Sequence, residues 1–304
     1  MEIKRYFPEF TPKAITFSID DGNEKYDEIF LDIVRPAKIK GTFNLYTKIN
    51  DVEMSEQLRK RYEGYEISNH CKRHPFAFNM EKEYSFSDDV FDPETADKNL
   101  VYKGNREGEY RIYHRSYWAT IAENEAYLRL VNETKAELEE IFGKGSIKGF
   151  VWPYGEQRNP ELVKAIKNLG YASVRKAYEH SFSLPKDRMS WGVNADSSNL
   201  ETKIIEFAAL PDDGELKFFC FGLHSVDFER QNKWEELKAF ARDYGKRPDD
   251  FWYASVGEIF EYEDAIKAAK IENGKISNSS DKEIYLSVDG KRYVIPPRSE
   301  IALA

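Results

Sequence analysis

The chain has 304 residues, 33% of them charged and 41% hydrophobic, which suits one large α/β domain with an appendage and excludes an intrinsically disordered protein. Its formal net charge of -9 argues against a nucleic-acid partner and against binding to an anionic membrane surface. Because it begins without the apolar run of a signal peptide, has no segment long enough to span a membrane and contains two cysteines, we expect a cytoplasmic protein without a disulfide framework.

The first part of the chain alternates predicted strands with predicted helices, which is the pattern of parallel βαβ units. An apolar, β-branched run over residues 13–19 predicts a buried strand, and this run ends in Asp20, Asp21 and Gly22. The next elements are expected to be a helix over Lys25–Val34, a strand over Gly41–Tyr46, a helix over Ser55–Tyr62 and a strand over Tyr65–His70.

The middle of the chain departs from this alternation. Residues 76–118 carry many charges and tyrosines without a sustained period, so they predict an insertion with a small hairpin around Lys103–Tyr113. A long amphipathic helix is expected to follow, from Ala119 to Phe142. The alternation then resumes, with strands over Ile147–Trp152, Tyr171–Val174, Leu216–Phe221 and Phe251–Ser255 and helices over Pro160–Leu169, Leu200–Ala209, Trp234–Tyr244 and Val256–Ala269.

The tail of the chain has a different character. From Ile271 to Ala304, apolar and polar residues alternate, with turn signals at Asn273-Gly274 and Asp289-Gly290 that are typical of β-hairpins. We therefore expect a main domain over 1–268, which contains the insertion, and a small β-hairpin appendage over 269–304.

Asp20 and Asp21 are the first polar pair that follows a predicted strand. On their own they are more typical of a surface turn, because Asp-Gly sequences are common in turns. Like charges at a strand end are also stabilised by a cation between them, so a metal site is the alternative. Neighbouring strand residues point to opposite faces, so both aspartates can serve one site if the strand ends there, as Gly22 permits.

Two histidines, His70 and His74, lie at the end of the strand predicted over Tyr65–His70. Imidazoles four residues apart converge on one ion when the segment turns helically, although surface or helix-capping histidines fit the pair equally well. Together with Asp21 they offer one carboxylate and two imidazoles, which suits zinc and also cobalt, nickel, manganese or iron. Asp20 would then lie beside the ion without binding it, which suits a general base acting on metal-bound water.

Two later strand ends carry further groups suited to catalysis. His224 follows an apolar strand, and α/β enzymes place catalytic residues at the carboxyl ends of parallel strands, although a buried structural histidine is the commoner alternative. Trp152-Pro153-Tyr154-Gly155 closes another strand and can present a backbone N–H as an oxyanion donor, although ordinary proline turns have the same residues.

In their order along the chain, these segments resemble the motifs of the polysaccharide deacetylases, also known as carbohydrate esterase family 4 or the NodB-homology group. The corresponding segments are Ser18-Ile19-Asp20-Asp21-Gly22, His70-Cys71-Lys72-Arg73-His74-Pro75, Val151-Trp152-Pro153-Tyr154-Gly155 and Leu223-His224. The resemblance spans roughly residues 10 to 265 and is specific, because each motif closes a predicted strand and the order is the family's own. The chain also looks like a less-studied bacterial branch of this family whose members carry a Trp-Pro-Tyr-Gly turn.

The resemblance implies an α/β fold, a distorted, incomplete (β/α) barrel of the NodB type, with the site at the carboxyl ends of its strands. It also implies hydrolysis of an N- or O-acetyl group on a carbohydrate, in which one divalent ion, most simply Zn²⁺, activates the water that attacks the acetyl carbonyl. Carried over by position, Asp20 is the base, His224 the acid and the Tyr154 N–H an oxyanion donor. The implied metal ligands are Asp21, His70 and His74.

One departure from the family concerns the arginine that normally begins the third motif and pairs with the base through a fourth-motif aspartate. Val151 stands in its place. Arg175, one strand later, is a candidate substitute, with Asp196 as its candidate partner and Trp152 as a further accessory residue. Two alternatives therefore stay open, an amide hydrolase that acts on a small nitrogenous molecule with the same site and a catalytically silent carbohydrate-binding protein.

Overall fold

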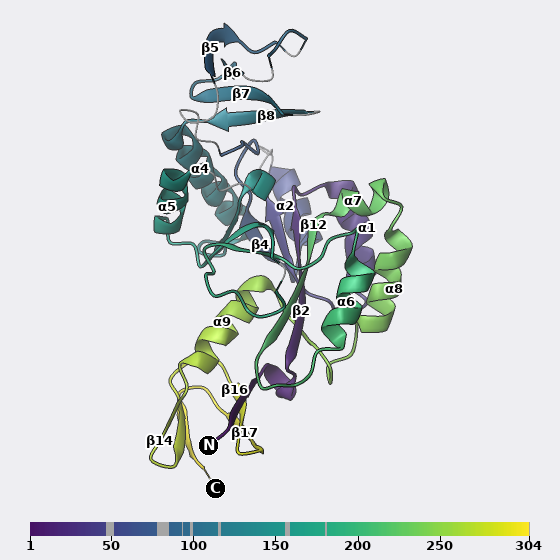
Figure 1. Ribbon diagram of the computed structural model, residues 1–304, viewed down its shortest axis with the longest axis vertical. Coiled ribbons are helices and arrows are strands. Elements are labelled where there is room, and N and C mark those ends of the chain that lie inside the picture. Colours follow the sequence, from purple (N-terminus) through teal and green to yellow (C-terminus); the bar gives the residue numbers. More distant parts are fainter. Residues whose placement is uncertain are drawn as a thin grey trace.

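The computed structural model describes residues 1–46, 52–77, 85–92, 94–97, 100–114, 117–155, 159–179 and 181–303. At its centre lies a curved parallel sheet (Figure 1). Its strands are β2 (Lys13–Asp20), β3 (Thr42–Leu45), β4 (Glu66–Asn69), β9 (Gly149–Val151), β10 (Ser173–Tyr178), β11 (Trp191–Val193), β12 (Lys217–His224) and β13 (Trp252–Tyr253). The strand order is β11-β10-β9-β4-β3-β2-β12, and β13 pairs with β2.

The two edges of this sheet meet just beyond β11. The Asn194 N–H donates to the Cys220 carbonyl (2.8 Å), and the Gly222 N–H donates to the Ala195 carbonyl (3.0 Å). Ala195 and Phe221 form an isolated parallel bridge at the same place. The sheet is therefore a distorted, nearly closed barrel, which confirms the predicted fold class.

Helices cover the outer face of the barrel (Figure 1). They are α1 (Glu24–Val34), α2 (Val52–Arg61), α4 (Asn124–Phe142), α5 (Pro160–Asn168), α6 (Leu200–Ala208), α7 (Ser225–Arg230), α8 (Trp234–Tyr244) and α9 (Val256–Lys267). On this outer face, Phe17 of β2 packs against Phe30 of α1, with ring centroids 4.9 Å apart. Because strand side chains alternate, Ser18 and Asp20 point the other way, into the barrel, where Asn44 donates hydrogen bonds to both.

The insertion forms a sheet of its own, which projects beyond α4 (Figure 1). Its strands, in sheet order, are β5 (Ser85–Val90), β6 (Leu100–Lys103), β7 (Glu109–His114) and β8 (Tyr117–Ala122). Pairing of β6 with β7 confirms the predicted hairpin around Lys103–Tyr113. The predicted helix start at Ala119 is wrong, because residues 117–122 pair with β7 and α4 begins at Asn124. Residues 78–84, 93, 98–99 and 115–116 of the predicted insertion lie outside the described residues.

The appendage consists of two small antiparallel sheets, β1-β16-β17 and β14-β15-β18. Their strands are β1 (Ile3–Tyr6), β14 (Lys270–Glu272), β15 (Lys275–Asn278), β16 (Ile284–Val288), β17 (Lys291–Ile295) and β18 (Ser299–Ala302). Both predicted turns occur, and the one between β16 and β17 has positive φ at Asp289 (48°) and Gly290 (82°), as a type I′ turn requires. Because β1 pairs with β16, the start of the chain belongs to the appendage in space, although the sequence pattern placed it in the main domain.

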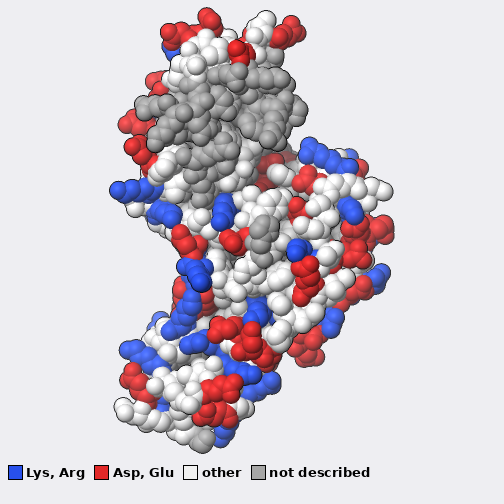
Figure 2. Space-filling view, viewed as in Figure 1, with Lys and Arg blue, Asp and Glu red and all other residues white. Residues whose placement is uncertain are grey.

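The insertion and the appendage lie at opposite ends of the long axis of the molecule, with both chain termini in the appendage (Figure 1). Figure 2 shows acidic and basic side chains intermingled over the visible face of the barrel and of the appendage. Within the described part of the chain, no helix combines the length and the apolar character needed to cross a bilayer.

Candidate active site

Polar side chains from separate motifs meet at the carboxyl ends of the barrel strands. Parallel pairing places Asn44 and His224 beside Asp20, on the two strands that flank the end of β2. Asn44 Nδ2 donates a hydrogen bond of 2.7 Å to Asp20 Oδ1 and one of 2.8 Å to Ser18 Oγ. Asp20 is 5% exposed, so protein groups rather than bulk water hold its carboxylate. Sequence patterns did not single out Asn44, because it lies inside a predicted strand.

Arg175 reaches Asp20 from another strand of the barrel. It lies on β10, in register with Val151 of the neighbouring β9. Its Nη2 donates to both carboxylate oxygens of Asp20, and both side chains are buried. Asp196, the candidate partner of Arg175, instead accepts a hydrogen bond of 2.7 Å from the Tyr178 hydroxyl. Asp20 therefore has a buried guanidinium beside it, although Val151 stands where the third motif normally begins with arginine.

Asp21, His70 and His74 come together at the same end of the barrel. One donor atom from each lies within 4.8 Å of the others, and the two imidazole Nε2 atoms are 3.4 and 3.5 Å from Asp21 Oδ1. The φ of Asp21 is 76°, and this left-handed turn at the strand end lets the adjacent carboxylates serve one site. Burial alone would raise the pKa of Asp21, but its interaction with His70 and the nearby imidazoles of His74 and His224 hold that pKa well below its ordinary value.

His70 and His74 differ in what favours the neutral imidazole form that can bind a cation. His70 Nδ1 lies 3.0 Å from the Val151 carbonyl oxygen, and a hydrogen on Nδ1 that is donated there leaves the Nε2 lone pair facing Asp21. Burial, with the neighbouring His70, lowers the pKa of His74 to about 4. His74 is therefore a neutral imidazole near pH 7, which is the form that binds a metal.

His224 lies on the other side of Asp21. Its Nε2 is 3.6 Å from Asp21 Oδ2, and its Nδ1 is 2.9 Å from Asp227 Oδ2. Burial alone would lower the pKa of His224, but the hydrogen bond with Asp227 and the charges of Asp20 and Asp21 raise it to about 9. The imidazole is therefore protonated near pH 7, the state that a general acid needs. Sequence reasoning missed Asp227, whose only signal is its place three residues after His224.

A cavity of about 550 Å³ opens at this end of the barrel. Its lining contains all six residues predicted for catalysis or metal binding, together with Trp152 and Arg175. Tyr154 has a φ of 60°, and its ring centroid lies 4.6 Å from that of His74. Of the two aromatic lining residues, Tyr154 is 38% exposed and Trp152 is buried.

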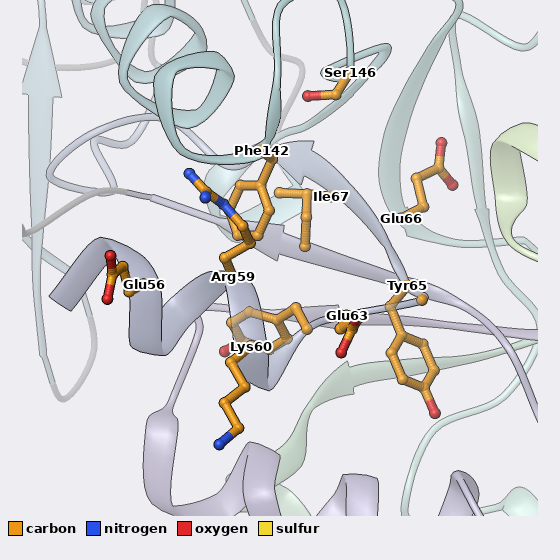
Figure 3. Close-up of a pocket in the computed structure, with 11 residues that line it drawn as sticks. Glu56, Arg59, Lys60, Glu63, Tyr65, Glu66, Ile67, Phe142 and Ser146 are labelled. Carbon is orange, nitrogen blue, oxygen red and sulfur yellow. The ribbon is translucent and has the colours of Figure 1, made fainter. Parts of the chain in front are cut away.

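A second hollow, of about 480 Å³, lies at the amino end of β4 and is drawn in Figure 3. Arg59 from α2, Phe142 from the end of α4 and Glu66 are among its lining residues. None of the predicted site residues lines it. Glu66 has a structural role there, because its carboxylate accepts hydrogen bonds from the Thr42 hydroxyl (2.6 Å) and the Gly257 N–H (2.9 Å).

Comparison with known proteins identifies the family of this chain. Residues 8–174, more than half of the chain, match the family model for polysaccharide deacetylase. No curated protein matches the chain in sequence.

Several solved structures are similar at low sequence identity. A family 4 acetyl xylan esterase from Clostridium thermocellum in complex with a cobalt ion is 15% identical, with 82% of this chain and 89% of that chain covered at a TM-score of 0.48. A family 4 carbohydrate esterase from Bacillus anthracis is 14% identical over 82% of this chain and 83% of that chain, with a TM-score of 0.45. A peptidoglycan deacetylase from Bacillus subtilis is 18% identical over 87% of this chain and 94% of that chain, also at 0.45.

Proposed function

The chain belongs to the polysaccharide deacetylase family, and from this premise we propose that it hydrolyses an N-linked or O-linked acetyl group of a carbohydrate. The observation that carries the proposal is the position of Asp20 and His224, side by side on adjacent strands and both next to Asp21. A base that activates water and an acid that protonates the leaving group are the two groups that hydrolysis of an amide or ester uses.

The residues present fit a divalent metal ion. Asp21, His70 and His74 offer one carboxylate and two imidazoles within 4.8 Å of one another, and the Val151 carbonyl orients one of the imidazoles. We propose Zn²⁺ as the ion, with Co²⁺, Ni²⁺, Mn²⁺ or Fe²⁺ as alternatives that the same donors accept. When bound, such an ion supplies a Lewis acid that polarises a carbonyl and lowers the pKa of water.

Each remaining residue has a distinct part in the proposed reaction. Asp20, held by Arg175 and Asn44, accepts the proton that water loses as its oxygen bonds to the acetyl carbon. The Tyr154 N–H donates a hydrogen bond to the carbonyl oxygen as negative charge develops there. His224 donates its proton to the sugar nitrogen or oxygen as the bond to the acetyl carbon breaks. Acetate and the deacetylated sugar are the products.

Acetate release from a panel of N- and O-acetylated oligosaccharides tests this function. We expect release from part of the panel, loss of release after treatment with a chelator, and recovery when one of the divalent metals is added back. Ammonia release or ring opening from small cyclic amides, without acetate release, would favour the amide hydrolase instead. A fully metal-loaded protein that releases neither product would favour a silent carbohydrate-binding protein.

Replacing His74 with alanine should weaken Zn²⁺ binding by more than about 100-fold. Loss of a residue that only supports a metal ligand costs up to about 100-fold in affinity, and loss of a ligand itself should cost more. The reason is that the substitution removes one donor of the three-residue set. Competition with a chromophoric chelator measures this affinity without any substrate. Asp227→Asn is the matched control, because Asp227 contacts His224 and lies outside the donor set. A similar loss of affinity in both variants would contradict the assigned ligands.

A further inference from the structure

A fully buried carboxylate outside the site joins the segments that follow its base and its acid. Asp27 lies on α1, the helix that follows the Asp-Asp-Gly turn, and it is 0% exposed. Its Oδ1 accepts a hydrogen bond of 2.6 Å from the Ser225 hydroxyl, and its Oδ2 accepts one of 2.7 Å from the Tyr62 hydroxyl. Ser225 directly follows His224 and is the first residue of α7. Asp27 therefore links the helix after the base to the helix after the acid.

Asp27 is an unfavourable side chain to bury at this position. Burial raises its pKa to about 6, although the hydroxyls of Ser225 and Tyr62 and the charge of Arg61 oppose that rise. The two hydroxyls and Arg61 therefore stabilise the charged form that burial disfavours. An ionised carboxylate loses more hydration on burial than neutral donors restore, and a neutral amide could accept the hydrogen bond from Ser225 at a smaller cost. The presence of the charge points to a role beyond stability.

The hydrogen bond between Asp27 and Ser225 lies next to the bend that sets the direction of the His224 imidazole. Pairing of β12 with β2 fixes the Cα of His224 beside that of Asp20. The direction of the imidazole depends in addition on the bend from β12 into α7, where His224 is extended (φ -119°, ψ 136°) and Ser225 begins the helix. Ser225 is 0% exposed, and its hydroxyl ties the first residue after this bend to α1.

We propose that Asp27 is a positioning residue that holds Ser225 and thereby keeps the His224 imidazole directed at the site. The inference rests on the proposed function, because it takes His224 to be the acid. A carboxylate suits this role because a hydrogen bond to a charged acceptor is about twice as strong as one between neutral groups. Tyr62 directly follows α2 and donates to the other oxygen of Asp27, so it supports the carboxylate from a segment other than the bend.

Ser225→Ala and Tyr62→Phe form a matched pair, because each removes one hydroxyl that donates to Asp27. We expect similar losses of thermal stability in the two variants. Ser225→Ala should lower kcat about tenfold with KM and Zn²⁺ affinity unchanged, because a small misplacement of a catalytic group slows the chemical step. Tyr62→Phe should keep the kcat of the unchanged protein. Asp27→Asn should lower kcat in the same direction, and the Asp27→Asn/Ser225→Ala double variant should lose less than the product of the single losses.

Imidazole NMR spectra of the Zn²⁺-loaded protein at fixed pH give a readout that needs no substrate. The His224 signal, identified by its absence from His224→Gln, should move in Ser225→Ala and in Asp27→Asn and stay in place in Tyr62→Phe. If the unchanged protein releases no acetate and the signal moves as expected, the proposed function fails and the positioning role stands. Equal losses of kcat in the matched pair, or a His224 signal that does not move in Ser225→Ala, would overturn the inference.

Discussion

Replacing Asp20 with asparagine should lower acetate release by about 10²–10⁴-fold, which is the contribution of a positioned general base. Asparagine has nearly the same shape as aspartate, and it cannot take up the proton that the attacking water loses. Asp21, His70 and His74 are unchanged by the substitution, so Zn²⁺ binding should be retained. The measurement is kcat at saturating substrate, with the metal content of the same preparation.

Asp32→Asn is the control for this experiment, because it makes the same chemical change on an exposed position of α1. It should leave both turnover and metal content as they are. Undiminished acetate release by metal-loaded Asp20→Asn would refute the role of Asp20 as the base. Loss of turnover together with loss of the metal would instead make Asp20 a metal ligand.

Much of the barrel could be predicted from the sequence, because buried parallel strands are continuous apolar runs that alternate with amphipathic helices. The misplaced helix start at Ala119 shows where this reasoning fails. Residues 117–122 become a strand through pairing with β7, and a local period carries no information about that partner. The same holds for β1, which is defined by its pairing with β16 near the other end of the chain.

The site shows the same division between local and long-range information. Residues that follow strands could be predicted to meet, because the carboxyl ends of parallel strands share one edge of the sheet. Asn44 could not be found in this way, because its place beside Asp20 depends on strand register. Asp227 could not be found either, because it lies on a short helix that the apolar pattern does not mark. The reach of Arg175 to Asp20 depends on the curvature of the barrel, which strand positions alone do not specify.

Replacing Arg175 with methionine should lower the free energy of unfolding by about 3–5 kcal/mol, the usual cost of removing one partner from a buried ion pair. Asp20 would stay buried and would keep the hydrogen bond from Asn44 but lose its ion pair. Acetate release should also fall, because the carboxylate loses the group that contacts both of its oxygens. Urea unfolding measures the first effect and kcat the second.

A double-mutant cycle separates an effect through Asp20 from an effect of packing. Asp20→Asn alone already leaves the buried Arg175 guanidinium without its carboxylate, and Arg175→Met in that background removes this unpaired charge, so it should cost much less stability there than in the unchanged protein. An equal cost in both backgrounds would mean that Arg175 acts through packing alone. Arg175→Lys keeps the charge and changes the length and direction of the donor group, so it should recover more of the stability than of the activity. Val151 occupies the family's arginine position and lies in register with Arg175. A smaller cost in the Asp20→Asn background would therefore mean that Arg175, on the neighbouring strand, replaces the family's arginine.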